Sequence, residues 1–154
     1  MNTTPSLSRP IIESLYSEAL LLADEVRSVF ALGMGDAAVD ADDRLRLALS
    51  SEGLKATTRM MHVLAWLLNQ RAYFSGELNE SQLRAHGRLP EDRPTNAEDI
   101  EMLEPATQAL IDDTIKLHTR ISRLDQAWGD HFEARPAVHS LRDRIGRAMI
   151  SNSV

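Results

Sequence analysis

The strongest constraint on the fold is an apolar seam in the last third of the chain. Its members alternate spacings of four and three residues without a break: Leu103, Thr107, Leu110, Thr114, Leu117, Ile121, Leu124 and Trp128. This is the spacing of helices that pack in the manner of a coiled coil. Ile111 and Ile115 widen the apolar face, as a bundle helix requires. The seam predicts a long helix from about Glu104 to Gly129, buried against other helices.

A second long helix is predicted from Asp42 to Ser75. It contains the apolar run from Met60 to Leu68, in which His62 is the only polar residue. A membrane-spanning helix needs roughly 20 apolar residues, so this shorter run indicates a helix buried inside the protein. Gly53 lies within the predicted helix, although a mid-helix glycine costs about 1 kcal/mol relative to alanine. A break at Ser50 to Gly53 is the alternative.

At about 100° per residue, this second helix has two faces. We assign the apolar face to the core; it consists of Met60, Met61, Leu64, Leu67 and Leu68. The opposite face, here called the outer stripe, is polar but carries two aromatic residues. Its members are Lys55, Arg59, His62, Trp66, Asn69 and Tyr73. Tryptophan, tyrosine and arginine are enriched at protein contacts, so the outer stripe predicts a partner or dimer interface. The alternative is that Trp66 and Tyr73 pack beneath a loop of the same chain.

The N-terminal part of the chain predicts one further long helix. Residues 1–9 are polar and expected to be flexible. Pro10 suits the first turn of a helix, because its missing N–H costs nothing there. Apolar residues then follow helical spacing as far as Leu32, and Gly33 and Gly35 are expected to end the helix.

Shorter elements are predicted around the long helices. Asn79 and Gln82 match a capping box, which predicts a short helix from Glu80 to Ala85. The stretch from His86 to Asn96 has two prolines, a glycine and mixed charge, and is predicted to be a surface loop. A last short helix is predicted from Pro136 to Met149, where three arginines flank a narrow apolar stripe.

These elements predict an all-α fold, because no pair of strands is evident. Long helices joined by short connections pack as antiparallel neighbours. We therefore expect an antiparallel three-helix bundle with a short extra helix after the second long helix and a short C-terminal helix. The length of 154 residues suits one domain, which we place at residues 10–154.

Composition and motifs narrow the function. The net charge of −6 argues against general nucleic-acid binding, which needs a basic surface. The absence of cysteine excludes disulfides and thiolate chemistry. The five histidines lack zinc-site spacing, and no nucleophile–base pair or phosphate-binding loop is evident. We therefore expect a protein that is not an enzyme, with no metal and no cofactor. No secretion signal precedes the first helix, which favours the cytoplasm.

Charge is distributed unevenly along the second helix. Residues 54–76 contain Lys55, Arg59 and Arg71 but no acidic residue. Arg71 is expected to point toward the core face, where an unpaired charge would be costly. We expect Arg71 to form a structural ion pair with one of the acids at the ends of the other long helices. The candidates are Glu13, Glu18 and Glu104.

Four short motifs in the second helix resemble the central helix of the DUF1465 family. They are Thr57-Thr58-Arg59, Trp66-Leu67-Leu68, Gln70-Arg71-Ala72 and Gly76-Glu77. Weaker similarity to the first and third helices of that family occurs at residues 15–20 and 120–125. The resemblance covers roughly residues 11–125, and nothing beyond Trp128 can be matched.

The resemblance implies a helical fold and a role as an adaptor that delivers substrates to the ClpXP protease. The partners it implies are a protease component or a response-regulator-like protein, together with protein substrates. From the apolar flanks of the outer stripe we also expect a homodimer. The alternative is a structural or scaffolding homodimer without a protease link. The segment from Pro136 to Met149 is a second candidate for partner binding.

Overall fold

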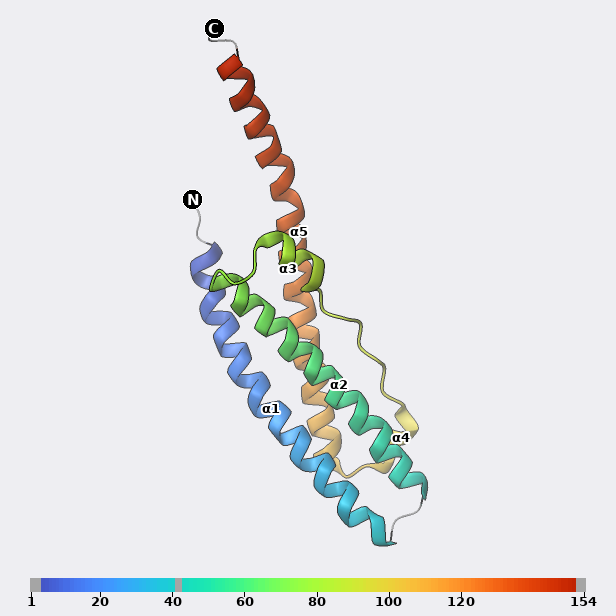
Figure 1. Cartoon of the computed structure of the whole chain (residues 1–154). Helices are drawn as coiled ribbons and strands as arrows, with labels where there is room; N and C mark the ends of the chain where they lie inside the picture. Colours follow the sequence, from blue (N-terminus) through green and yellow to red (C-terminus); the bar gives the residue numbers. More distant parts are fainter. Residues whose placement is uncertain (1–3, 41–42, 152–154) are drawn as a thin grey trace. The chain divides into compact units, whose positions relative to one another are not determined.

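The computed structural model describes residues 4–40 and 43–151, and it describes side chains over residues 8–31 and 43–130. Every element within these ranges is a helix (Figure 1). In chain order they are α1 (Thr4–Asp40), α2 (Asp43–Phe74), α3 (Glu80–His86), α4 (Ala97–Met102) and α5 (Pro105–Ser151). The chain forms two compact units, Met1–Ile121 and Ser122–Val154. The predicted all-α class, with three long helices and short helices between them, is confirmed.

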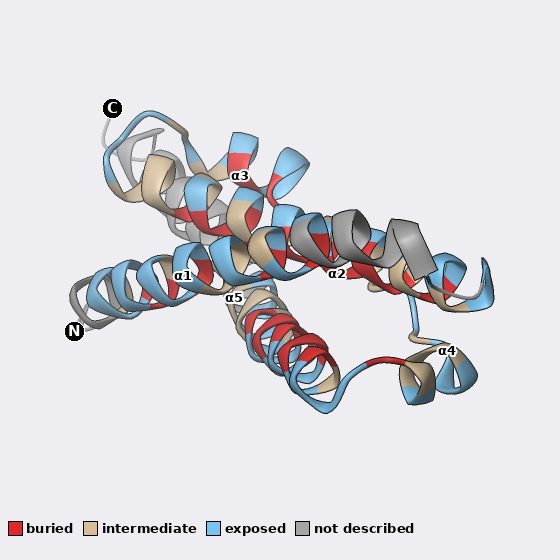
Figure 2. Cartoon of the chain, turned by 90° about the horizontal axis from the view of Figure 1, so that it is seen from below, coloured by how far each residue is buried: buried red, intermediate tan, exposed pale blue. Residues whose placement is uncertain are grey.

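The first unit is built from α1, α2 and the beginning of α5. Seen from below, the buried sides of these helices face one another (Figure 2). α1 supplies apolar residues at helical spacing, and α5 supplies the predicted seam. The described residues buried in α1 and α5, with Leu103 two residues before α5, are Ile12, Leu15, Ala19, Val26, Phe30, Leu103, Thr107, Leu110, Ile111, Thr114, Leu117, His118 and Ile121. The seam is thus confirmed from Leu103 to Ile121.

The direction of the third long helix sets this bundle apart from a simple up-down-up arrangement. α1 and α2 are antiparallel, as predicted, whereas α2 and the part of α5 in the first unit, residues 105–121, run in the same direction (Figure 1). Thr114 of α5 accepts a hydrogen bond from Arg59 at the middle of α2, and further along α5 Arg120 reaches Glu18 in the first half of α1. Parallel neighbours need a connection that returns along the bundle. Here the extended segment between α3 and α4 provides it.

α1 and α2 approach each other closely at Gly53. A Cβ atom at this position would lie 2.6 Å from Cδ1 of Phe30, which is too close for any real side chain. α2 continues through Gly53, and the missing side chain at this position makes room for the Phe30 ring. The prediction of one long second helix is confirmed.

Two of the long helices extend beyond their predicted ends. α1 begins at Thr4 rather than Pro10 and continues past Gly33 and Gly35 to Asp40. α5 continues through Gly129 to Ser151. The predicted break at Gly129 is therefore absent, and the predicted C-terminal helix is the last part of α5. A single glycine costs a helix only about 1 kcal/mol relative to alanine, which does not force an end. The side chains of residues 136–149 lie outside those described.

The short elements follow their capping residues. Asn79 and Gln82 form the predicted capping box, and α3 begins at Glu80. α4 was not predicted. The side chain of Asn96 accepts hydrogen bonds from the amides of Glu98 and Asp99 at its first turn. An asparagine followed by acidic residues is the sequence signal that identifies this helix start.

Candidate functional site: a buried arginine beneath an extended strap

The face of α2 that we assigned to the exterior is largely inside the protein. Arg59 is 1% exposed and Trp66 is 2% exposed. Met60 and Leu67 are buried as predicted, but Met61 and Leu68 of the predicted core face are exposed. The cause is that α2 is covered on two sides. α1 covers one side, and the extended segment 87–96 and α5 cover the other. Helical periodicity alone does not identify the second side.

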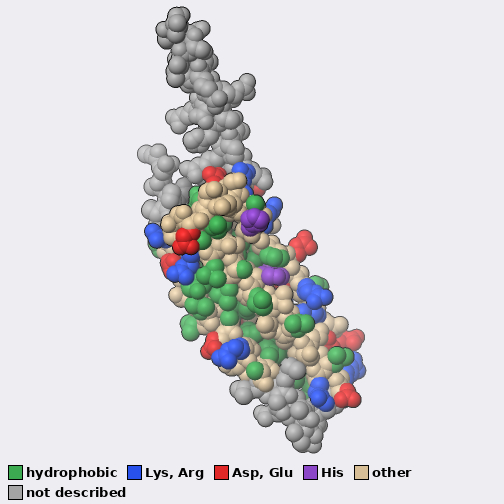
Figure 3. Space-filling view, viewed as in Figure 1, with side chains coloured by type: hydrophobic (Ala, Val, Ile, Leu, Met, Phe, Trp, Pro, Cys, Tyr) green, Lys and Arg blue, Asp and Glu red, His purple; other side chains and the backbone are tan. Residues whose placement is uncertain are grey.

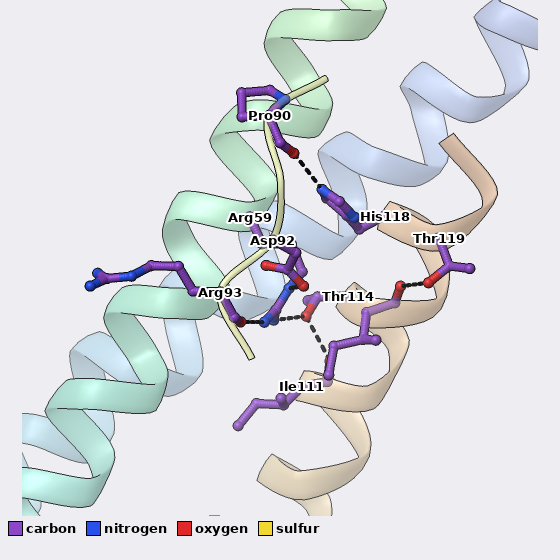
Figure 4. Close-up of polar contacts among 9 residues, drawn as sticks. Arg59, Pro90, Asp92, Arg93, Ile111, Thr114, His118 and Thr119 are labelled. Carbon is purple, nitrogen blue, oxygen red and sulfur yellow. Dashed lines mark hydrogen bonds and ion pairs between the residues drawn. The ribbon is translucent and has the colours of Figure 1, made fainter. Parts of the chain in front are cut away.

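The segment Gly87–Asn96, here called the strap, lies across Arg59. It has no helix or strand and runs between α3 and α4 (Figure 1), and the close-up shows it passing over Arg59 (Figure 4). Arg59 donates from Nε to Oδ2 of Asp92 at 2.7 Å and from its second terminal nitrogen to the carbonyl of Arg93 at 3.4 Å. Its first terminal nitrogen donates to Oγ1 of Thr114 at 2.9 Å. One guanidinium group thus joins α2, the strap and α5.

Two further contacts hold the strap on either side of Asp92 and Arg93. Nε2 of His118, on α5, lies 3.3 Å from the carbonyl oxygen of Pro90. The backbone N–H of Asn96 donates to Oε1 of Glu52, on α2, at 3.0 Å. The same carboxylate oxygen accepts from Nζ of Lys55 at 3.0 Å. We call Glu52, Arg59, Thr114 and His118 the strap seat.

Electrostatics makes the strap important for the stability of this unit. Arg59 is buried, so its charge must be neutralised inside the protein, and Asp92 does this while remaining 25% exposed. Glu52 is also fully buried, and Lys55 is its charge partner. Oε2 of Glu52 has no hydrogen-bond partner among the described residues. Removing one member of a buried ion pair leaves an uncompensated charge, which is strongly destabilising.

The predicted interface on the outer stripe is therefore corrected. Arg59 and Trp66 are core residues. Of the two residues that the alternative placed beneath a loop, Trp66 is buried and Tyr73 is half-buried. His62, Asn69 and Tyr73 are half-buried, and the ring of Tyr73 lies 5.7 Å from that of Phe74. These five residues do not form one exposed surface.

Arg71 forms an ion pair, but on the surface. Its Nε donates to Oε1 of Glu13 at 2.9 Å, and its guanidinium lies over the ring of Tyr16 at 4.3 Å. Glu18, another predicted partner, is bonded by Arg120 at 2.8 Å instead. Glu104 precedes α5, and its carbonyl accepts from the amide of Gln108.

α2 carries an exposed apolar surface that we did not predict. Leu47, Leu54, Met61 and Leu68 are spaced by seven residues and are between 47% and 70% exposed. We call them the α2 stripe. α1 adds exposed Leu20 and Leu21, and apolar side chains gather on the face formed by these two helices (Figure 3). The seven-residue spacing was readable in the sequence, but two of its members had been assigned to the core.

Other chemistry in the described region is limited. Residues 8–31 and 43–130 contain no group of three metal-binding side chains. None of the described helices is long and apolar enough to span a membrane. On the surface of α5, the hydrogen bond and charge of Asp112 raise the pKa of Lys116. Asp112 is thus paired with a lysine.

These features define a class: an all-α protein in which three long helices surround buried charges and an extended segment returns the chain along the bundle. The chain belongs to the DUF1465 family, described as a protein of unknown function, whose profile matches residues 3–149. The match extends beyond residues 11–125, where the resemblance was recognised, toward both ends of the chain. No curated protein and no solved structure matches the chain.

Proposed function

We propose that this protein is a non-enzymatic adaptor that binds partner proteins and helps deliver substrates to the ClpXP protease. Within its family it resembles the regulator of CtrA degradation, whose role this is. Cell-cycle-regulated proteolysis in the cytoplasm is the setting that this resemblance implies. Membership of DUF1465 over residues 3–149 supports the proposal, because that regulator belongs to the same family.

The observation that carries a binding role is the α2 stripe. Large exposed apolar surfaces on a folded protein mark sites of interaction. A spacing of seven residues along one helix is the spacing at which a second helix packs. The stripe replaces the outer stripe as the proposed contact surface, and its partner is either a helix of another protein or a second copy of this chain.

A capture experiment tests the adaptor role. The intact protein, immobilised, is offered ClpX, a response-regulator-like protein and a candidate substrate. Leu54→Glu places a charge in the middle of the stripe and is expected to reduce capture at least tenfold while leaving helicity unchanged. Ala109→Glu changes an exposed residue of α5 away from the stripe and serves as the matched control. Capture that survives Leu54→Glu would remove the stripe from the proposal.

The second candidate function is a structural or scaffolding homodimer. The α2 stripe favours it equally, because a second copy can cover the same apolar surface. The two functions differ in what is captured. A dimer that binds neither ClpX nor a regulatory protein supports the scaffold and contradicts the adaptor.

A further inference from the structure

The strap is bound in the way that a protein binds a peptide. Three of its contacts to the strap seat use backbone atoms: the carbonyls of Pro90 and Arg93 and the N–H of Asn96. The carboxylate of Asp92 adds a side-chain contact, to Arg59. Backbone contacts are available in any extended segment. The seat therefore selects an extended backbone that carries one correctly placed carboxylate.

The strap is also attached with little apolar contact. Most of its side chains are exposed, including Arg88, Pro90 and Glu91, and Leu89 is only partly covered. The side chain of Arg93 points away from the seat (Figure 4). Segments with few buried apolar contacts open at lower free energy than the core around them. The prolines at positions 90 and 94 keep the strap out of helical structure.

We propose that the strap is an internal ligand, and that the strap seat binds an extended acidic segment of a partner protein in exchange for it. The charge of Arg59 determines the chemistry of the partner. Opening of the strap alone would leave a buried guanidinium without its carboxylate, which is costly. Exchange for another segment with an aspartate or glutamate restores the ion pair. This inference goes beyond the adaptor role, and it uses different residues from the α2 stripe.

The test uses a synthetic ten-residue peptide with the strap sequence, GRLPEDRPTN, labelled for fluorescence anisotropy. In wild-type protein the tethered strap competes with the free peptide. Asp92→Asn in the protein weakens the tethered strap and leaves all four seat residues unchanged. We expect the Asp92→Asn protein to bind the peptide at least tenfold more tightly than the wild type. We also expect the peptide to raise the melting temperature of the variant.

Glu91→Gln is the matched control, because Glu91 is the neighbouring acid and its side chain is exposed. A protein with Glu91→Gln is expected to bind the peptide no better than the wild type. A peptide that carries the Asp92→Asn change is expected not to bind. The proposal is overturned if a helical Asp92→Asn protein does not bind the strap peptide, or if both peptides bind equally well.

Hydrogen exchange in the unmodified protein decides the case in which Asp92→Asn does not fold. The amide of Asn96, bonded to Glu52, is expected to exchange at least a hundredfold faster than the amide of Leu67 in the core of α2. Equal rates would show that the strap opens only when the protein unfolds, which excludes exchange. Neither measurement needs a protease component or the α2 stripe, so failure here is distinguishable from failure of the adaptor role.

Discussion

At the scale of single residues, the ion pair between Arg59 and Asp92 is asymmetric. Arg59 is almost fully buried, whereas a quarter of the Asp92 side chain is exposed. Asp92→Ala therefore leaves a buried charge unpaired and is expected to lower the free energy of unfolding by about 3 kcal/mol. Arg59→Met leaves a carboxylate that water can reach and is expected to cost less. Urea unfolding of both variants measures the difference, and a larger loss from Arg59→Met would contradict this assignment.

Two glycines in long helices predict opposite effects of the same substitution. Gly53→Ala puts a methyl group against the Phe30 ring and is expected to destabilise the protein by about 1–3 kcal/mol, the usual cost of overpacking a core. Gly129→Ala meets nothing within 4 Å and is expected to stabilise α5 by up to about 1 kcal/mol through helix propensity. Thermal unfolding followed by circular dichroism compares them. Equal shifts would mean that α1 and α2 are not in close contact at Gly53.

At the scale of elements, the seam of α5 is the part of the fold most accessible to prediction. Leu117→Ala removes a side chain that is 1% exposed and is expected to cost about 2–5 kcal/mol. Thr119→Ala, two residues along and exposed, is expected to change stability by less than about 0.5 kcal/mol. Denaturant titration of both variants checks the assignment. A loss below about 1 kcal/mol at Leu117 would contradict it.

The faces of α2 show where prediction from the sequence ends. Helical spacing correctly groups Arg59 with Trp66, and Met61 with Leu68, because spacing is a property of the helix alone. Which group is buried depends on the elements that cover α2, and these are distant in sequence. A charged residue such as Arg59 is expected at the surface. It can be buried here because Asp92, on the strap, and Thr114, on α5, supply its hydrogen-bond partners. The sequence therefore predicts the helices better than the candidate site.

At the scale of the whole molecule, the strap and the order of the helices have the same cause. A short connection after α2 would have made α5 antiparallel to it. Instead the chain returns along the first unit as an extended segment, so α5 starts at the same end of this unit as α2, and residues 105–121 run in the same direction as α2 (Figure 1). The helical pattern contains no information about that return. The return of the chain explains why a segment predicted to be a surface loop contributes to the neutralisation of a buried charge.

Self-association is the property of the whole molecule that the α2 stripe predicts. We expect a dimer at micromolar concentration in sedimentation velocity, because four large apolar side chains along one helix lie exposed to water in a single chain. Met61→Glu is expected to convert the dimer to a monomer of unchanged helicity, whereas Ala109→Glu on α5 leaves it intact. Trp66→Ala, in contrast, is expected to lower the melting temperature of the protein, because Trp66 belongs to the core. A dimer that tolerates Met61→Glu would place the interface elsewhere, and a wild-type monomer would leave the stripe to a helix of another protein.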